Sequence, residues 1–570
     1  MKHTRIPVAL VATMAVASLG LSACSSSGGS KAGSSAKPSA TSLAANTIKI
    51  NAQPRSALKQ GGTLTWAIDQ YSTQWNYNQI NGAEYSTDAV IEAVEPIIFR
   101  VDPATQKVTP NTNYLTGMPT VTTVNGKQTV TYNINPKAKW SDGTAISYKD
   151  FAAQWQALNG KNTKYQIGSS TGYSNITSVV AGTSPQQVVV TFDQNFGDWT
   201  SLFAPLYPAS AQSTPDEFNK GFLNKIPVTA GPFKIESMNA TTSTVTVARD
   251  PNWWGDPAIL DKIVFRAMTT DAADGAFANG EVDYLNIGPS AAGVKQAQGR
   301  SDGEIREAAG PQFRHVTFNA KSPLLSDVKV RQALFQAIDR TAIANSDLKG
   351  LGWPALLLNN HFFMNNQEGY QDNAGVLGKY DPTAAKAALD AAGWKLNGQY
   401  RQKDGKTLEL TFVYPDGTAV SKNESVLLQA MFAAVGVKLD ISAVPSDDFF
   451  DKYVQPGKFD LTAFSWLGNA WPVSSNYSIY QSPVGSNNFQ NFAWTSDPNV
   501  DSLMNKSIAD LDHTQAIADA NAADKAIWQD AGVFPLYQRA DIYGAKKTLA
   551  NLGAPQDQDE VVYENIGFTS

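Results

Sequence analysis

The stretch LELTFVYPDGTAVSKNESVLLQAMFAAVGVKLDISA, residues 408–443, decides the fold class of this 570-residue chain. Apolar and polar side chains alternate in its first part, as in a half-buried strand, with apolar positions at Leu408, Leu410, Phe412 and Tyr414. An alanine-rich helix is expected over 421–435, ending at Gly436, and alternation returns at Val437, Leu439, Ile441 and Ala443. Strand, helix and strand in this order predict a βαβ unit with two parallel strands, and therefore an α/β fold.

The loops after these strands are the first candidates for a ligand site. The carboxyl ends of parallel strands face the ligand crevice of an α/β sheet, so Tyr414 and Asp416 are expected on that edge. A further run, 459–465, is expected to be a parallel neighbour whose following segment opens onto the same edge. We therefore predict a crevice lined by Tyr414, Trp466, Asn469 and Trp471. The sequence leaves open the alternative that the two tryptophans pack inside the protein.

The rest of the chain changes character along its length. The first half is rich in expected strands, at 63–68, 129–134, 188–192 and 244–248, and a capping box at Ser147 to Asp150 opens a helix. In the second half, helices are expected to begin at Asp327 and at Asp381-Pro382, and the latter should stop at Gly393. The loop after the first strand is rich in aromatic and amide side chains. It adds four candidate ligand contacts: Tyr71, Trp75, Asn76 and Tyr77.

Composition excludes several classes of protein. With 42% hydrophobic residues, 17% charged residues and a single cysteine, the chain is not collagen-like, disulfide-stapled or wholly disordered. Its length predicts two or more domains with sizeable cores. A formal net charge of -6 argues against a nucleic-acid partner, because phosphate binding needs clustered lysine and arginine.

The amino terminus predicts export and a lipid anchor. A short basic region precedes the apolar segment 6–21, which has the layout of a secretory signal. The segment Leu21-Ser22-Ala23-Cys24 resembles the bacterial lipobox, in which cleavage leaves a diacylglycerol-modified cysteine. We therefore expect a signal peptide at 1–23, lipidation of Cys24, a flexible tether at 24–57, and a protein held at the outer face of the cell membrane. The alternative is a buried free cysteine in an ordinary signal peptide.

Motifs for catalysis and metal binding are weak. The sequence Gly168-Ser169-Ser170-Thr171-Gly172 fits a hydrolase nucleophile elbow, but its flanks predict neither the preceding strand nor the following helix, so a polar loop is expected. The histidines beyond the signal segment, His315, His361 and His513, lack metal-ligand spacing. No Gly-x-x-x-x-Gly-Lys nucleotide loop occurs. We expect no enzymatic activity, no metal and no cofactor.

Eight short blocks carry a resemblance to a known family. They are GGTL at 61–64, EPII at 95–98, WSDGT at 140–144, AGPF at 230–233, RDPNWW at 249–254, NGEVD at 279–283, VRQALFQAIDR at 330–340 and AAGW at 391–394. In this order they resemble the family 5 solute-binding proteins of ABC importers, which include oligopeptide, dipeptide and nickel binders.

The resemblance implies a two-lobed clamshell of the class II periplasmic-binding-protein type, with the ligand at the hinge. Lobe I would comprise 58–317 and the return segment 534–570, with an extra subdomain near 101–243. Lobe II would comprise 318–533, and the chain crossings near Asn319 and Pro535 would form the hinge. The implied partners are a small-molecule or peptide ligand and the permease subunits of an importer. The protein itself is expected to be a monomer.

The resemblance implies binding rather than catalysis, with an oligopeptide as the first ligand class. A peptide main chain matches Asn, Tyr and backbone groups, while aromatic walls accept varied side chains. An oligosaccharide is the second class, because sugars also stack on Trp and Tyr, and a serine hydrolase using Ser170 is a distant third. In peptide-binding members the position resembling Asn469 commonly holds an aspartate that pairs with the ligand's ammonium group. The neutral amide here predicts weaker selectivity for a free amino terminus.

Overall fold

The computed structural model describes residues 48–103, 106–445, 448–485, 487–554 and 561–570. The expected signal peptide, Cys24 and most of the expected tether lie outside these residues. Within the described ranges, no helix has both the length and the hydropathy that crossing a membrane requires.

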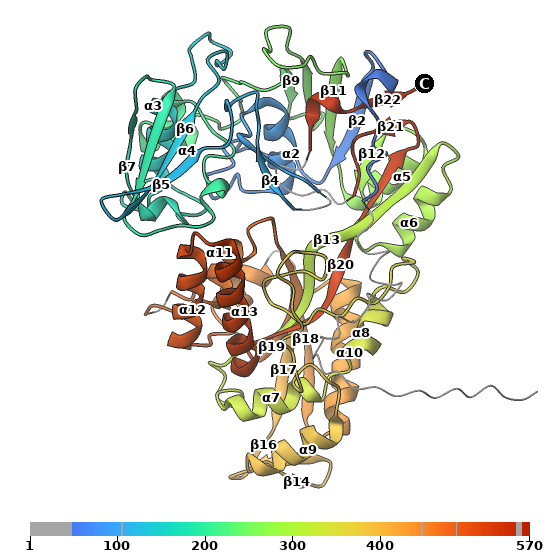
Figure 1. Cartoon of the computed structure of the whole chain (residues 1–570). Helices are drawn as coiled ribbons and strands as arrows, with labels where there is room; N and C mark the ends of the chain where they lie inside the picture. Colours follow the sequence, from blue (N-terminus) through green and yellow to red (C-terminus); the bar gives the residue numbers. More distant parts are fainter. Residues whose placement is uncertain (1–47, 104–105, 446–447, 486, 555–560) are drawn as a thin grey trace, which may run out of the picture. The chain divides into compact units, whose positions relative to one another are not determined.

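A ten-stranded mixed sheet is the backbone of the described part of the chain (Figure 1). Its strands, in spatial order, are β18 (Lys438–Val444), β17 (Glu409–Pro415), β19 (Leu461–Leu467), β13 (Gly303–Phe318), β20 (Val533–Lys546), β12 (Tyr284–Asn286), β2 (Thr63–Ile68), β11 (Lys262–Ala267), β10 (Thr244–Arg249) and β9 (Phe233–Asn239). The sheet thus joins elements from both halves of the sequence.

The predicted βαβ unit is confirmed. Strands β17 and β18 pair in parallel from Glu409↔Lys438 to Pro415↔Val444, and α10 (Ala419–Ala434) connects them. The chain leaves α10 through Gly436, whose φ of +81° is a conformation that glycine adopts without strain. The predicted third strand is also parallel to β17, but it continues to Leu467, because β13 pairs with it as far as Gln312↔Leu467. Trp466 and Leu467 therefore belong to the strand and not to the loop that we expected there.

Two long strands, β13 and β20, connect the two ends of the sheet. They run side by side through the middle of the described fold (Figure 1) and pair antiparallel from Gly303↔Lys546 to Thr317↔Val533. The register shifts twice, between Ala309 and Phe313 and between Arg314 and His315. One end of the pair lies beside β12 and the other beside β19. The first shift falls on Gly310 and Pro311, and the second, between Arg314 and His315, falls where His315 pairs with the expected hinge residue Pro535. The boundaries of the lobes by residue number stay a prediction.

A second sheet lies in the region expected to form the extra subdomain. Its antiparallel strands are β5 (Thr120–Val124), β6 (Lys127–Asn133), β8 (Gln187–Phe192) and β7 (Ile176–Ala181). The predicted capping box at the start of α3 (Tyr148–Leu158) is confirmed, with both reciprocal hydrogen bonds between Ser147 and Asp150. A hydrophobic cluster of its own, which includes Phe99, Tyr132, Phe151 and Phe203, packs under this sheet.

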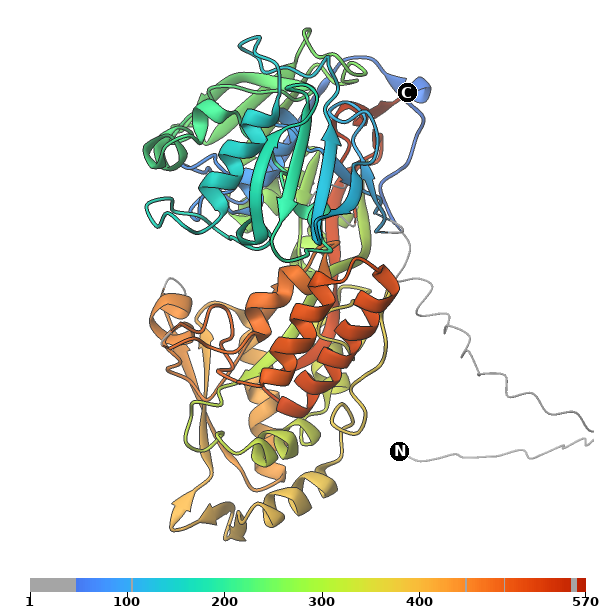
Figure 2. The ribbon, with the colours of Figure 1, turned by 60° about the vertical axis from the view of Figure 1, so that its left-hand side comes forward.

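Smaller sheets and the remaining helices complete the described fold. The small sheets are β1 (Leu58–Lys59) with β22 (Gly567–Thr569) and β21 (Leu549–Ala550), β14 (Lys395–Asn397) with β15 (Tyr400–Lys403) and β16 (Lys406–Thr407), and β3 (Phe99–Val101) with β4 (Val108–Pro110). The other helices are α2 (Tyr85–Val94), α4 (Pro215–Lys220), α5 (Thr270–Ala278), α6 (Ala291–Gln298), α7 (Val328–Gln336), α8 (Arg340–Asp347), α9 (Pro382–Ala391), α11 (Pro472–Tyr480), α12 (Pro498–Ala509) and α13 (His513–Asp530). Helices α11, α12 and α13 pack together as one group (Figure 2).

Candidate ligand-binding site

Strands β17 and β19, whose ends were predicted to face a ligand, are parallel neighbours in the sheet. The carboxyl ends of the parallel strands β17 and β19 lie at one edge of the sheet, and α10 begins just after β17. The side chain of Tyr414 is buried in the main hydrophobic cluster. Asp416 is exposed and closes a turn, since its Oδ1 accepts the Gly417 N–H at 2.9 Å. The second carboxylate oxygen of Asp416 remains available at this edge.

Trp466 is part of an aromatic row. Its indole lies nearly parallel to the ring of His315, with centroids 5.8 Å apart, and to the ring of Phe492, with centroids 5.7 Å apart. Burial and the nearby Arg314 charge hold the pKa of His315 well below its usual value, so this ring is neutral and packs as a flat aromatic group. Trp466 therefore serves mainly as packing, with only part of its ring left exposed.

Asn469 is held by hydrogen bonds on both its side chain and its main chain. Its Oδ1 accepts the N–H of Trp471 at 2.9 Å, and its main-chain carbonyl accepts from Nε2 of Gln367 at 3.2 Å. The adjacent Gly468 donates its N–H to the carbonyl of Pro311 at 2.6 Å. Because this bond uses one lone pair of the amide oxygen and leaves both Nδ2 hydrogens without a partner among the described residues, we expect Asn469 to offer a ligand chiefly its Nδ2 donor.

Trp471 lies where the loop after β8 meets the α11–α13 group. Its Nε1 donates to Oγ1 of Thr200 at 2.9 Å, and its ring is buried. In the same loop, Asp198 accepts hydrogen bonds from the main chain and the hydroxyl of Ser474, in the first turn of α11, and Gly197 donates to the carbonyl of Ile508 at 2.6 Å. Burial raises the pKa of Asp198. These contacts join the β5–β8 sheet region to the helices, and Trp471 belongs to that junction.

The aromatic loop after β2 is largely folded onto itself. Trp75 and Asn76 are fully buried, and Nδ2 of Asn76 donates to the carbonyl of Phe218 at 3.1 Å. The Tyr77 N–H donates to the hydroxyl of Tyr207, which in turn donates to the carbonyl of Trp75. The structure thus places Trp75 and Asn76 in the interior, where the Trp75 carbonyl and the Asn76 side chain are hydrogen-bonded. Tyr71 and Tyr77 are only partly buried and stay candidates for ligand contact.

A cluster of charged side chains on β13 and β20 was missed by the sequence analysis. The Arg314 guanidinium forms a two-pronged ion pair with Glu424 of α10, with Nε to Oε1 at 2.7 Å and Nη2 to Oε2 at 2.5 Å. Beside it, burial and the Glu424 carboxylate raise the pKa of Asp347 to about 8, and the Tyr537 hydroxyl donates to Asp347 at 3.1 Å. Arg539 and Asp541 follow at alternate positions of β20. Alternating polar residues in such an apolar segment are the signal that could have identified this cluster.

A second set of acidic side chains comes from the end of β2 and from α2, and their charges act together with that of Asp541 on β20. Burial raises the pKa of Asp88 to about 7, and it raises the pKa of Asp69 at the end of β2. Burial raises the pKa of Tyr85, which starts α2, and the charges of Asp69, Asp541 and Asp88 raise it further. Carboxylates from β2, α2 and β20 therefore gather around one tyrosine.

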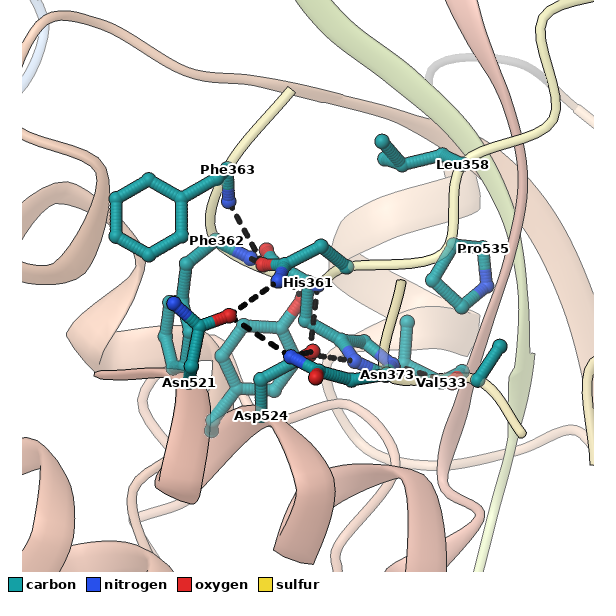
Figure 3. Close-up of polar contacts among 12 residues, drawn as sticks. Leu358, His361, Phe362, Phe363, Asn373, Asn521, Asp524, Val533 and Pro535 are labelled. Atoms are coloured by element: carbon teal, nitrogen blue, oxygen red, sulfur yellow. Dashed lines mark hydrogen bonds and ion pairs between the residues drawn. The ribbon is translucent and has the colours of Figure 1, made fainter. Parts of the chain in front are cut away.

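The histidines have structural surroundings in the described residues. His361 is completely buried, with Nδ1 2.7 Å from Oδ1 of Asp524 and Nε2 3.0 Å from the carbonyl of Val533 (Figure 3). Asp524 and the Val533 carbonyl thus hold the His361 ring through its two nitrogens. Asn373 donates to Oδ2 of Asp524 and to Asn521, which ties this loop to α13.

Ser170 lies in a polar loop, as expected. The residues after it form only the short 3₁₀ turn Tyr173–Asn175. Within the described ranges, the histidine rings bond to Thr317, Asp524, Val533 and Glu368, and none of them bonds to Ser170. The same ranges hold no group of three or more His, Cys, Asp or Glu side chains placed for a metal ion.

Comparison with known proteins decides the family. The family model of the bacterial extracellular solute-binding proteins, family 5, matches residues 119–488. The chain belongs to this family. Its members are substrate-binding proteins of ABC importers, as the resemblance implied.

Family 5 relatives cover nearly the whole chain. The oligopeptide-binding protein OppA of Mycobacterium tuberculosis is 35% identical over 99% of this chain and 94% of its own length. Among solved structures, the periplasmic EDTA-binding protein EppA aligns with a TM-score of 0.82 at 26% identity, over 90% of this chain and 98% of EppA. The Bacillus subtilis protein AppA, in complex with a nonapeptide, aligns with a TM-score of 0.72 at 18% identity, over 90% of this chain and 100% of AppA. The predicted two-lobed α/β fold of this family is thereby confirmed.

Proposed function

We propose that this family 5 protein captures an oligopeptide between its two lobes and delivers it to the permease of an ABC importer. The observation that carries the proposal is the 35% identity to the oligopeptide-binding protein OppA, which extends over 99% of this chain. AppA, which shares the fold, holds a nonapeptide. A ligand that contacts both lobes stabilises the closed form by its higher affinity for that form, and the closed form is what a permease would recognise.

A free strand edge supports a peptide over a sugar. Strand β13 pairs with β19 from Phe318↔Leu461 to Gln312↔Leu467, whereas β17 pairs with β19 only at Leu461 and Thr462. Beyond Thr462, the edge of β19 that faces β17 has no strand partner among the described residues. An extended peptide binds such an edge through its main chain, and the identity of its side chains then matters little. The donor Nδ2 of Asn469, two residues beyond Leu467, suits a peptide carbonyl.

The expected location completes the proposal. The apolar segment at 6–21 and the lipobox-like residues before Cys24 support export and a diacylglycerol anchor at the outer face of the membrane. We propose a monomer that carries out no chemistry on its ligand, in keeping with a family defined by solute binding.

Mass spectrometry of the natural ligand tests the proposed function. The chain without residues 1–23, purified under native conditions and then denatured, should release a mixture of peptides. Release of oligosaccharides and no peptides would replace the peptide by the second ligand class. The Ser170→Ala variant serves as a control and should release the same peptides, uncleaved. A peptide that the wild-type protein hydrolyses and the variant does not would instead indicate a hydrolase.

A further inference from the structure

Arg539 of β20 is a partly buried cation without an ion-pair partner among the described residues. Its Nη1 donates to Oε1 of Gln312 at 3.1 Å, and no carboxylate of the described residues lies within ion-pair distance of it. Burial and the nearby Arg314 charge lower the pKa of Arg539. A guanidinium has five N–H donors, so most of the donors of Arg539 remain unused in a partly desolvated place.

Other buried arginines of the chain show how unusual this is. Arg331 donates to the carbonyls of Leu325, Ser326, Asp530 and Ala531, and Arg340 donates to those of Leu358, Gly378 and Pro535. Arg314 has its ion pair with Glu424. These three residues are buried and each has several acceptors, whereas Arg539 is partly exposed with a single acceptor. Arg539 is therefore accessible to a further acceptor.

The neighbours of Arg539 hold it in place without neutralising it. Gln312 accepts from Arg539 through Oε1 and donates through Nε2 to Oδ1 of Asp541 at 2.8 Å. Gly310 is required for this arrangement, since a Cβ there would lie 2.4 Å from Oδ1 of Asp541. The Glu424 carboxylate is occupied by Arg314. The Glu424 carboxylate and Oδ1 of Asp541 are thus engaged with donors other than Arg539.

Arg539 also stands where the two ends of the sheet meet. It lies opposite the register shift of β13, with Ala540 paired to Ala309 on one side and Gln538 paired to Phe313 on the other. The charges that act on it come from Arg314 and Glu424, at the β19 end, and from Asp541, whose charge also acts on Tyr85 of α2. Arg539 therefore lies between the part of the strand pair that adjoins β12 and the part that adjoins β19.

We propose that Arg539, oriented by Gln312, is the subsite that binds a carboxylate of the ligand. The inference rests on the proposed peptide-binding function and adds the chemistry at one point of the ligand, either its C-terminal carboxylate or an acidic side chain. The planar guanidinium offers a carboxylate two parallel N–H donors, and the desolvated surroundings strengthen such a bond. The competing explanation is that Arg539 only balances the charge of Asp541 through Gln312.

Binding of matched peptides separates these explanations. Protein freed of endogenous ligand by unfolding and refolding is offered a library of synthetic peptides, two to nine residues long, without acidic side chains. The tightest binder found by native mass spectrometry is then titrated by calorimetry as the free acid, as the C-terminal amide, and as an amide with one residue replaced by glutamate. The proteins compared are the wild type, Arg539→Gln, Arg539→Lys and the control Arg266→Gln, whose guanidinium lies on β11 and donates to the Glu281 carbonyl.

We expect the wild type to bind one carboxylate-bearing form about tenfold to a hundredfold more tightly than the plain amide, as a charge-assisted pair provides. A preference for the free acid identifies the C-terminus, and a preference for the glutamate amide identifies a side chain. Arg539→Gln should abolish the preference, Arg539→Lys should reduce it because the fork is lost, and Arg266→Gln should keep it. Circular dichroism checks that each variant is folded. If Arg539→Gln does not fold, the preference of Arg539→Lys for the carboxylate-bearing peptide, compared with that of the wild type, tests the proposed subsite.

Two results overturn the inference in different ways. If the wild type binds peptides without preferring any carboxylate, or if the Arg539 variants keep the wild-type preference, the proposed subsite is wrong while peptide binding stands. If the folded wild type binds no peptide of the library, the proposed function itself fails, and the inference fails with it.

Discussion

The side-chain amide of Asn469 has a fixed orientation, because the N–H of Trp471 needs its oxygen. With Oδ1 accepting that N–H at 2.9 Å, the Nδ2 group is the one left for a ligand. In Asn469→Asp the same oxygen still accepts from Trp471, while the donor becomes a second carboxylate oxygen. We expect binding of an N-acetylated peptide to weaken by about 1–3 kcal/mol, since a ligand carbonyl would then face an acceptor. Isothermal calorimetry measures the change.

The same variant also tests the expected selectivity for the peptide terminus. The wild type should bind the free and N-acetylated forms of one peptide with similar affinity, and Asn469→Asp should favour the free amine, because a carboxylate pairs with an ammonium group. Asn397→Asp, an exposed position in β14, is the control. A wild-type protein that strongly prefers the free amine would show that another carboxylate takes the charged role, and Asp416 with its free oxygen would be the first to examine.

Asp347 should make stability depend on pH. Its pKa is raised from 3.8 to about 8 by burial and by the Glu424 carboxylate, so the folded protein retains a proton that the unfolded chain releases near pH 4. The free energy of unfolding should therefore fall as the pH rises from about 4 to about 8, by at most about 1.4 kcal/mol per pH unit for this group. In Asp347→Asn the amide oxygen can still accept from the Tyr537 hydroxyl, and the side chain does not titrate, so this part of the slope should vanish.

Urea unfolding at several pH values between about 5 and 8 measures that slope. Asp256→Asn, an exposed position, is the matched control and should leave the slope as it is. An identical slope in the wild type and in Asp347→Asn would contradict the prediction. Asp88, whose pKa is raised to about 7 by burial, contributes a slope of the same sign in both proteins and so does not affect the comparison.

At the level of single residues, sequence analysis predicted where Asn469 lies but not the contacts that it makes. Asn469 lies at the predicted edge, but its bond to Trp471 depends on a local turn that composition does not reveal. Trp75 and Asn76 lie in the interior instead, because an aromatic, amide-rich loop can also fold inward, as this one does with bonds from Asn76 to Phe218 and from Tyr207 to Trp75. Arg539 and Gln312 are brought together by a pairing between strands more than 200 residues apart, which a single sequence does not specify.

Among the elements, the unit 408–443 was predictable because its signals are local. Alternation, an apolar helical face and the glycine stop each act over a few residues, and β17, α10 and β18 follow them closely. Strand β13 was not predicted, since Gly310 and Pro311 interrupt its pattern. In the structure that interruption is absorbed as a register shift against β20, where the missing Cβ of Gly310 leaves room for Asp541.

Helix α11 receives its N-terminal cap from a distant segment. Trp471 at its N-cap position supplies no side-chain cap, and Pro472 has no N–H, so Asp198 in the loop after β8 accepts from Ser474 instead. In Asp198→Ala the first turn of α11 loses this acceptor, which should weaken the junction by about 1 kcal/mol. Dyes on cysteines introduced at the exposed residues Gln194 and Leu511, which flank the junction, should then report a larger mean separation.

Asp193→Ala provides the control, since this exposed aspartate pairs with Lys127 inside the β5–β8 sheet region. It should leave the dye separation unchanged. The same separation in Asp198→Ala and in the wild type would mean that the neighbouring contacts of Trp471 with Thr200 and of Gly197 with Ile508 are sufficient to hold the junction.

For the whole molecule, the order of short blocks predicted more than any single pattern did. Each block alone is weak, but together they identified the family, and with it the two-lobed fold that periodicity could not have assembled. The sheet order, in which β13 and β20 link strands from both halves of the chain, arises from contacts between remote segments. Such contacts carry no local signal, which is why the lobe boundaries stay a prediction.

Attachment to a membrane is the remaining property of the whole molecule that the sequence predicts. Cys24 is the single cysteine of the chain and directly follows Leu21-Ser22-Ala23, so no disulfide within the chain competes for its thiol. We expect the protein produced in a bacterial host to partition into detergent and its N-terminal peptide to carry diacylglycerol, and we expect Cys24→Ala to abolish both. Ser25→Ala, one residue further on, is the control and should behave as the wild type does. Mass spectrometry of the N-terminal peptide and detergent phase separation measure the outcome.

Because a lipid anchor acts through its buried CH₂ groups at about 0.8 kcal/mol each, losing it should move the protein from the membrane to the soluble fraction without changing peptide affinity. A Cys24→Ala protein that still carries diacylglycerol would contradict the lipobox interpretation, and one that stays on the membrane without it would point to a second attachment.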